Sequence, residues 1–374
     1  MDSSRVNRRF CAAATSVAVA VLASACQWLV PLATTPGESD GGDAPDAPDG
    51  AVASDAGCTL HVKPPRPAPA AIGGDVSFVT VFSELSLAEP TDPSFCVPSE
   101  DLDLQDTCHD GAHATCVGPG ASSCDHEGGV DRVLNDTASL PAYRTVIERV
   151  PALNLTGQVR SGRHAILVRV SRYNGGPNDD SVTVEYLVSG GLPGAGDAGI
   201  APTFTAADRW VIDLSSTHIV DGGTDGTGAV HDDNAYVADG VLVSSVGTSL
   251  SALLIPLSKP ILVARVSPRE PFYLTKGRWS GAAPVESLLS SLAYAETNGS
   301  PLCPGNKTFD QLKEVACAVA DLSTQTLLAA PPCDALSASL AVVGAPASIG
   351  SIESFNRPVV LCDWGDSGAP PSCP

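Results

Sequence analysis

Positive charge is scarce in this sequence. The 374 residues include 21 lysines and arginines against 42 aspartates and glutamates, which gives a formal net charge of −21 at pH 7. A surface of this charge repels a phosphate backbone, so we do not expect the chain to bind nucleic acid.

Motifs that identify common enzymes are also absent. The sequence contains no Gly-rich phosphate loop, no His-Glu-x-x-His motif and no Cys-x-x-Cys pair. Gly365–Pro370 resembles the nucleophile motif of trypsin-like serine proteases, but no histidine lies in the sequence context that those enzymes use. We therefore predict no catalytic residue and favour a protein that is not an enzyme.

Long apolar runs are limited to the N-terminal region. The uncharged stretch from Gly240 to Ser258 is interrupted by Gly247 and Pro256. It therefore predicts strands rather than a helix that spans a membrane.

Residues 1–25 have the parts of an export signal, because three arginines precede a short apolar segment that ends in small residues. Leu22-Ala-Ser-Ala-Cys26 is similar to the lipobox of bacterial lipoproteins. The resemblance implies that Cys26 is lipidated and anchors an exported chain in the cell envelope, at the outer membrane or the cell surface. The same residues fit an ordinary A-x-A cleavage site, after which the chain would be secreted free.

The cysteine count agrees with lipidation. The chain has 12 cysteines, of which Cys11 lies in the signal, so an even number remains to form disulfides when Cys26 carries lipid. Proximity in sequence favours Cys116 with Cys124 and Cys362 with Cys373, but the sequence does not determine the pairing. The disulfide candidates are Cys58, Cys96, Cys108, Cys116, Cys124, Cys303, Cys317, Cys333, Cys362 and Cys373.

Residues 26–74 are predicted to form a disordered, acidic and proline-rich tether. Asp43-Ala-Pro-Asp-Ala-Pro-Asp49 repeats every three residues, and this composition cannot build a core. In the extended limit, residues 35–57 would reach on the order of 70 Å.

The folded region is predicted to be mainly β. In residues 164–172 and 181–188, apolar side chains alternate with polar ones, and turn residues join the two segments. Further strands are expected at residues 76–82, 143–150, 209–214, 235–238, 241–246, 250–257, 261–267 and 272–279. We predict a β-sandwich over residues 75–283, of jelly-roll or lectin-like kind.

Residues 284–374 are predicted to form a disulfide-linked segment of helices and loops packed on the sandwich. Apolar residues recur at helical spacing in residues 284–296 and again after Thr308-Phe-Asp-Gln311, which has the pattern of a capping box.

Clustered oxygen ligands offer a candidate calcium site, and calcium is the one cofactor that we consider. The candidates are Asp179, Asp180, Asp221, Asp225, Asp232, Asp233 and Asn234. Solvated turns favour the same residue types. A zinc site around Cys108 and His126 is the alternative to disulfides there.

Our first hypothesis is a membrane-anchored lipoprotein whose domain binds a polysaccharide or protein ligand without catalysis. The alternatives are an exported hydrolase with an unidentified active site and a structural protein of the envelope.

Overall fold

A computed structural model of the protein describes residues 63–69, 74–87, 116, 134, 154–194, 200–220, 223–252, 255–297, 300–325, 331–355, 362 and 372–373. Cys26, the acidic repeat, the strand expected at residues 143–150 and the Gly365–Pro370 motif lie outside these ranges, as do Cys58, Cys96, Cys108 and Cys124.

The predicted hairpin is present and regular. Strands β2 (Ala165–Tyr173) and β3 (Asp179–Gly191) are antiparallel, and their residues pair without a break from Ala165 opposite Ser189 to Ser171 opposite Thr183. The expected turn at Asp239 and Gly240 joins β7 (Val230–Ala238) to β8 (Val241–Ser245), with φ values of 49° and 76°. Positive φ at both central residues is the requirement of a type I′ turn, one of the two common two-residue hairpin turns.

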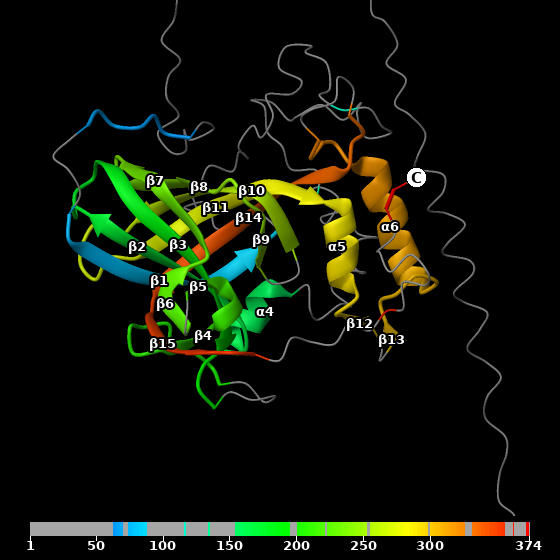
Figure 1. Ribbon diagram of the computed structural model, residues 1–374, viewed down its shortest axis with the longest axis horizontal. Coiled ribbons are helices and arrows are strands. Elements are labelled where there is room, and N and C mark those ends of the chain that lie inside the picture. Colours follow the sequence, from blue (N-terminus) through cyan, green and yellow to red (C-terminus); the bar gives the residue numbers. More distant parts are fainter. Residues whose placement is uncertain are drawn as a thin grey trace, which may run out of the picture. The chain divides into compact units, whose positions relative to one another are not determined.

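Eight antiparallel strands close into a β-barrel (Figure 1). Their order around the barrel is β3-β2-β1-β14-β11-β10-β8-β7, and β7 pairs back onto β3. The strands not yet introduced are β1 (Val76–Ser86), β10 (Ile255–Val266), β11 (Leu274–Pro284) and β14 (Ala335–Pro346).

The barrel interior is filled by large apolar side chains. Pairing places one face of each strand inside, and these inner side chains include Phe82, Val168, Tyr186, Leu262, Trp279 and Leu340, all buried. A barrel of eight strands is just wide enough for side chains to fill it. The fold is thus built around a packed core.

The prediction of a β-sandwich was therefore wrong, although the mainly β class was right. Alternation of apolar and polar residues shows that one strand face is buried, but it does not show whether the outermost strands pair. The prediction also missed β14, which fills the gap between β1 and β11 and comes from the segment expected to hold only helices and loops.

Glycines allow neighbouring strands of the barrel to approach closely. A Cβ atom at Gly344 of β14 would lie 2.0 Å from the carbonyl oxygen of Leu274, and one at Gly277 of β11 would lie 2.5 Å from the Cβ of Ala264. Only glycine permits such close approach of neighbouring strands.

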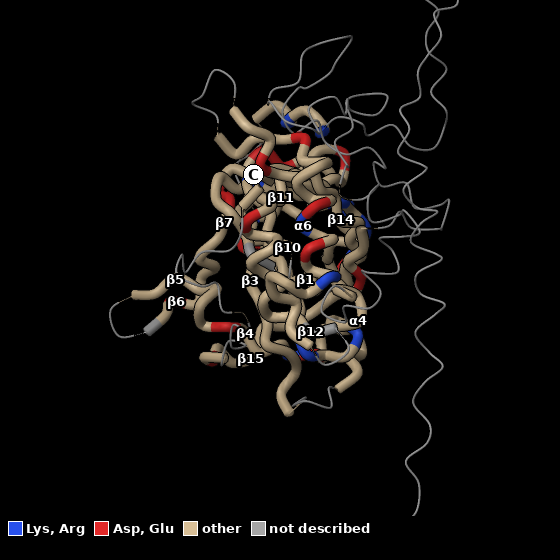
Figure 2. The backbone as a smooth tube through the Cα atoms, turned by 90° about the vertical axis from the view of Figure 1, so that its right-hand side faces the viewer, with Lys and Arg blue, Asp and Glu red and all other residues tan. Residues whose placement is uncertain are grey.

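Smaller elements cover or extend the wall. Strand β4 (Arg209–Asp213) pairs with β3, and β15 (Ser348–Glu353) pairs with β4 in parallel. A hairpin of β5 (Thr217–Val220) and β6 (Gly223–Gly228) projects from the barrel (Figure 2). The remaining short elements are α4 (Leu155–Arg160), η5 (Leu214–Ser216), β9 (Leu250–Ala252), β12 (Glu296–Thr297) and β13 (Ser300–Pro301).

Two helices follow β11 where the sequence predicted them. These are α5 (Val285–Leu292) and α6 (Lys307–Val319), which lie side by side (Figure 1). The side chain of Asn306 caps α6 by accepting a hydrogen bond from the backbone N–H of Thr308, so the cap precedes the predicted capping box. Among the described residues, no helix is long and apolar enough to cross a membrane.

Candidate functional site

A cavity of about 790 Å³ opens between α5, α6 and the residues that lead into β14. This volume lies within the range of ligand-binding pockets in general. Its described walls come from three separate parts of the sequence, which are residues 284–287, residues 310–325 with 332–334, and residues 372–373. We take it as the candidate functional site.

The first wall is α5, which continues directly from a barrel strand. Pro284 ends β11, and the backbone N–H of Val285 donates to the carbonyl oxygen of Asp334. Val285, Leu289 and Leu292 are buried at helical spacing, so the opposite face of the helix presents Glu286 to the cavity.

The second wall is α6, which a disulfide holds in place. Phe309 and Ala316 are buried, whereas Asp310, Lys313 and Glu314 line the cavity. Cys317, near the end of the helix, bonds to Cys373. This bond brings the C-terminal segment to the cavity rim.

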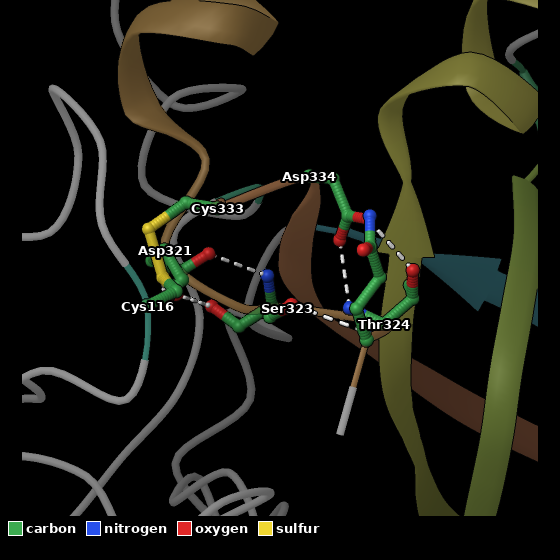
Figure 3. The surroundings of a disulfide bond; sticks show 8 residues. Cys116, Asp321, Ser323, Thr324, Cys333 and Asp334 are labelled. Carbon is green, nitrogen blue, oxygen red and sulfur yellow. Dashed lines mark hydrogen bonds between the residues drawn. A yellow bond between two sulfur atoms is a disulfide. The ribbon is translucent and has the colours of Figure 1, made fainter. Parts of the chain in front are cut away.

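The third wall is a loop that a carboxylate organises (Figure 3). Asp334 accepts hydrogen bonds from the backbone N–H of Thr324 at 2.7 Å and from its hydroxyl group at 2.8 Å. The Nε2 atom of Gln325 donates to the same carboxylate at 3.3 Å. Beside it, Cys116 is bonded to Cys333. Hydrogen bonds therefore hold Thr324 and Gln325 beside the start of β14, and the disulfide attaches Cys116 at the same place.

A neighbouring carboxylate fixes the same loop from its other end. Asp321 accepts from the backbone N–H of Ser337 at 2.8 Å and from its hydroxyl group at 2.6 Å. Bonds of this kind to an ionised group are stronger than those between neutral groups. The polar groups on this side of the cavity are thus held in a set geometry.

The charge of the cavity is strongly one-sided. Among the described residues that line it, Glu286, Asp310, Glu314 and Asp334 supply four carboxylates, and Lys313 supplies one ammonium group. Such a lining attracts positive charge and can accept hydrogen bonds from ammonium, guanidinium and hydroxyl groups.

Three disulfides correct the predicted pairing. Cys116 bonds to Cys333 rather than Cys124, Cys362 bonds to Cys303, and Cys373 bonds to Cys317. The bonds join residues 56 to 217 positions apart, so proximity in sequence was a poor guide. Disulfides form in oxidising compartments, and these three therefore indicate an exported chain.

The structure distributes the calcium candidates that it describes over strands β3, β6 and β7. Asp179 accepts from the backbone N–H groups of Asn174 and Ser181, and Asp232 accepts from those of Asn234 and Ser245. No group of three metal-binding side chains occurs among the described residues. Asp221 lies outside them, and calcium binding stays a prediction.

The other calcium candidates lie on the barrel wall and the projecting hairpin. Asp225 contacts His218 at 3.2 Å, and Asp233 lies 3.5 Å from His231. Hydrogen bonds from the hydroxyl and backbone N–H groups of Thr227 lower the pKa of Asp225 to about 2. Asp180 and Asn234 lie on β3 and β7, where their carbonyl oxygens accept hydrogen bonds from Arg66.

Comparison with known proteins gives no relative for this chain. No protein-family model, no curated protein and no solved structure matches it. The function of the chain must therefore be inferred from the geometry and charge of the cavity.

Proposed function

We propose that this protein is an exported lipoprotein, anchored through Cys26, whose barrel domain binds a partner without catalysis. The lipobox-like signal and the acidic tether support the anchor, and the disulfides agree with export. The long tether would hold the barrel clear of the lipid surface.

The ligand of the cavity is a positively charged segment of another protein. This choice rests on the four carboxylates and one lysine that the described part of the chain places around a space of about 790 Å³. Lysine or arginine side chains of a partner would enter the cavity and neutralise these carboxylates. The rigid, disulfide-held walls would limit the entropy lost on binding.

A binding assay with the full-length protein tests this function. The probes are a lysine- and arginine-rich peptide and an array of neutral and amino-bearing glycans. We expect the peptide to bind, with an affinity that falls as salt rises, because screening weakens exposed ion pairs. The double variant Glu286→Gln and Glu314→Gln should weaken peptide binding roughly three- to tenfold.

The matched control is Glu353→Gln, which removes an exposed carboxylate on β15, outside the cavity lining. It removes one negative charge, as each of the two cavity substitutions does, so unchanged binding separates the cavity from general attraction. Binding of glycans alone, or equal losses in the control and the cavity variant, would refute the proposal.

The anchor is tested separately with Cys26→Ser. We expect the wild-type chain to partition into a detergent phase and the variant to stay in the aqueous phase, because only the cysteine can carry the lipid. Equal partitioning of both chains would show that Cys26 is not the attachment point.

A further inference from the structure

The barrel closes at an irregular seam. We define the closing seam as the pairing of β3 residues 179–186 with β7 residues 230–237. Its register shifts between Asp179 and Val182 and again between Val182 and Val184. In contrast, the β11–β14 ladder on the opposite side of the barrel pairs from Lys276 to Pro284 without a shift.

Arg66 bridges this seam from outside. One guanidinium nitrogen donates to the carbonyl oxygen of Asp180 on β3, and another donates to that of Asn234 on β7. Asp180 lies at the first shift of register and Asn234 at the second. A planar guanidinium suits two acceptors at once, whereas a lysine ammonium acts as a single point charge.

Two further contacts hold Arg66 in place. Its Cζ atom lies 4.7 Å from the ring centroid of Tyr236, at a distance that allows a cation–π interaction. The hydroxyl group of Tyr236 donates to the carbonyl oxygen of Pro64. Tyr236 is on β7, so both contacts are made to the same side of the seam.

The segment that carries Arg66 is suited to this role. Lys63-Pro-Pro-Arg-Pro-Ala-Pro69, which we call the strap, has four prolines in seven residues. Proline-rich chain is already extended before it binds, so it loses little entropy on docking. Pro64 is buried, while Arg66 reaches the seam from an exposed position.

We propose that the outer wall at β3 and β7 is a binding surface for the chain's own proline-rich strap. The two hydrogen bonds of Arg66 then stabilise the pairing of β3 with β7 that closes the barrel. On this proposal the tether is attached to the barrel at the strap, before β1 begins. The strap contacts both strands whose pairing closes the barrel. A pull on the tether would act on the closing seam first.

Amide hydrogen exchange on the full-length chain tests this proposal. In Arg66→Ala, exchange should rise at least about fivefold at residues 179–186 and 230–237, since two charge-assisted hydrogen bonds are lost. The β11–β14 ladder should keep its wild-type rates. Arg66→Lys should give an intermediate rise at the seam. The control Arg209→Ala, an exposed arginine on β4, should leave the seam unchanged.

A proline-specific endoprotease gives an independent readout. In the wild type, the strap should be cut much more slowly than Pro45 and Pro48 of the acidic repeat, which serve as internal references. Arg66→Ala and Tyr236→Phe should both speed cleavage within residues 63–69. Tyr294→Phe, which alters an exposed tyrosine outside the strap contacts, should not.

Three results would overturn the proposal. The first is unchanged exchange at the seam in Arg66→Ala. The second is an equal rise over all barrel strands, which would mean that Arg66 contributes only to global stability. The third is wild-type cleavage in the strap as fast as at Pro45 and Pro48. None of these results depends on the cavity or its ligand.

Discussion

The rings of Tyr186 and Trp279 stack on each other inside the barrel, with centroids 5.8 Å apart and planes 6° from parallel. Tyr186 comes from β3 and Trp279 from β11, which lie on opposite sides of the circle of strands. The pair therefore spans the interior, and Phe82 packs against Trp279 from a third strand. Burial raises the pKa of Tyr186, whose hydroxyl group donates to Ser244 at 3.0 Å.

We expect Trp279→Ala to lower the free energy of unfolding by about 3–5 kcal/mol, because it removes the central side chain of the core. Tyr186→Phe keeps the ring and should cost about 1 kcal/mol, from the lost hydrogen bond. Urea unfolding of Tyr186→Phe, Ser244→Ala and the double variant would measure the coupling of the two groups. Fully additive losses would contradict this hydrogen bond.

The sequence predicted the individual strands better than it predicted that they close into a barrel. The hairpin of β2 and β3 was predictable because apolar residues recur at every second position of both strands in the sequence. Strand β14 was missed because both of its faces are buried, so small residues such as Ser337 and Ser339 replace exposed polar ones. Closure depends on the pairing of β3 with β7, which no local pattern records.

The candidate site could be predicted from the sequence less well than the fold. The sequence predicted α5 and α6, and the presence of disulfides, but not the bonds that join Cys317 to Cys373 and Cys116 to Cys333. The cavity exists only where these distant segments meet. Three of the acidic residues predicted as calcium ligands, Asp179, Asp225 and Asp232, accept hydrogen bonds from backbone N–H groups instead.

An ion pair on the barrel wall holds the projecting hairpin. Glu185 of β3 is almost buried and accepts from Arg169 at 2.7 Å and from the backbone N–H of Gly228 at 3.0 Å. Arg169 also donates to the carbonyl oxygen of Gly226. We expect Glu185→Gln to cost about 2–3 kcal/mol in chemical unfolding, since it leaves a partly buried guanidinium without its counter-ion.

The matched control for that variant is Glu84→Gln, which breaks the exposed pair with Arg160. This change should cost less than about 1 kcal/mol, because water screens exposed pairs. Equal losses for the two variants would mean that burial of Glu185 has no bearing on the strength of its ion pair.

The disulfide pattern predicts the result of peptide mapping. Digestion without reductant should release Cys303 linked to Cys362 and Cys317 linked to Cys373. Cys317→Ser together with Cys373→Ser should lower the free energy of unfolding by up to about 4 kcal/mol, because a loop of this length is no longer closed in the unfolded chain. A peptide that links Cys362 to Cys373 would refute the pattern.

The projecting hairpin offers a titration that can be followed at one side chain. Asp225 accepts from the hydroxyl group of Thr227 at 2.6 Å and from its backbone N–H at 2.9 Å, and these bonds lower its pKa from 3.8 to about 2. A lowered pKa means that the carboxylate favours the folded hairpin above pH 3.8, and that this contribution is lost as pH falls towards 2.

Carbon NMR should find the titration midpoint of Asp225 near pH 2. In Thr227→Val the midpoint should move towards 3.8, because the strongest donor is removed, whereas Thr275→Val should leave it unchanged. A midpoint near 3.8 in the wild type would show that the hairpin does not hold Asp225 in this arrangement in solution.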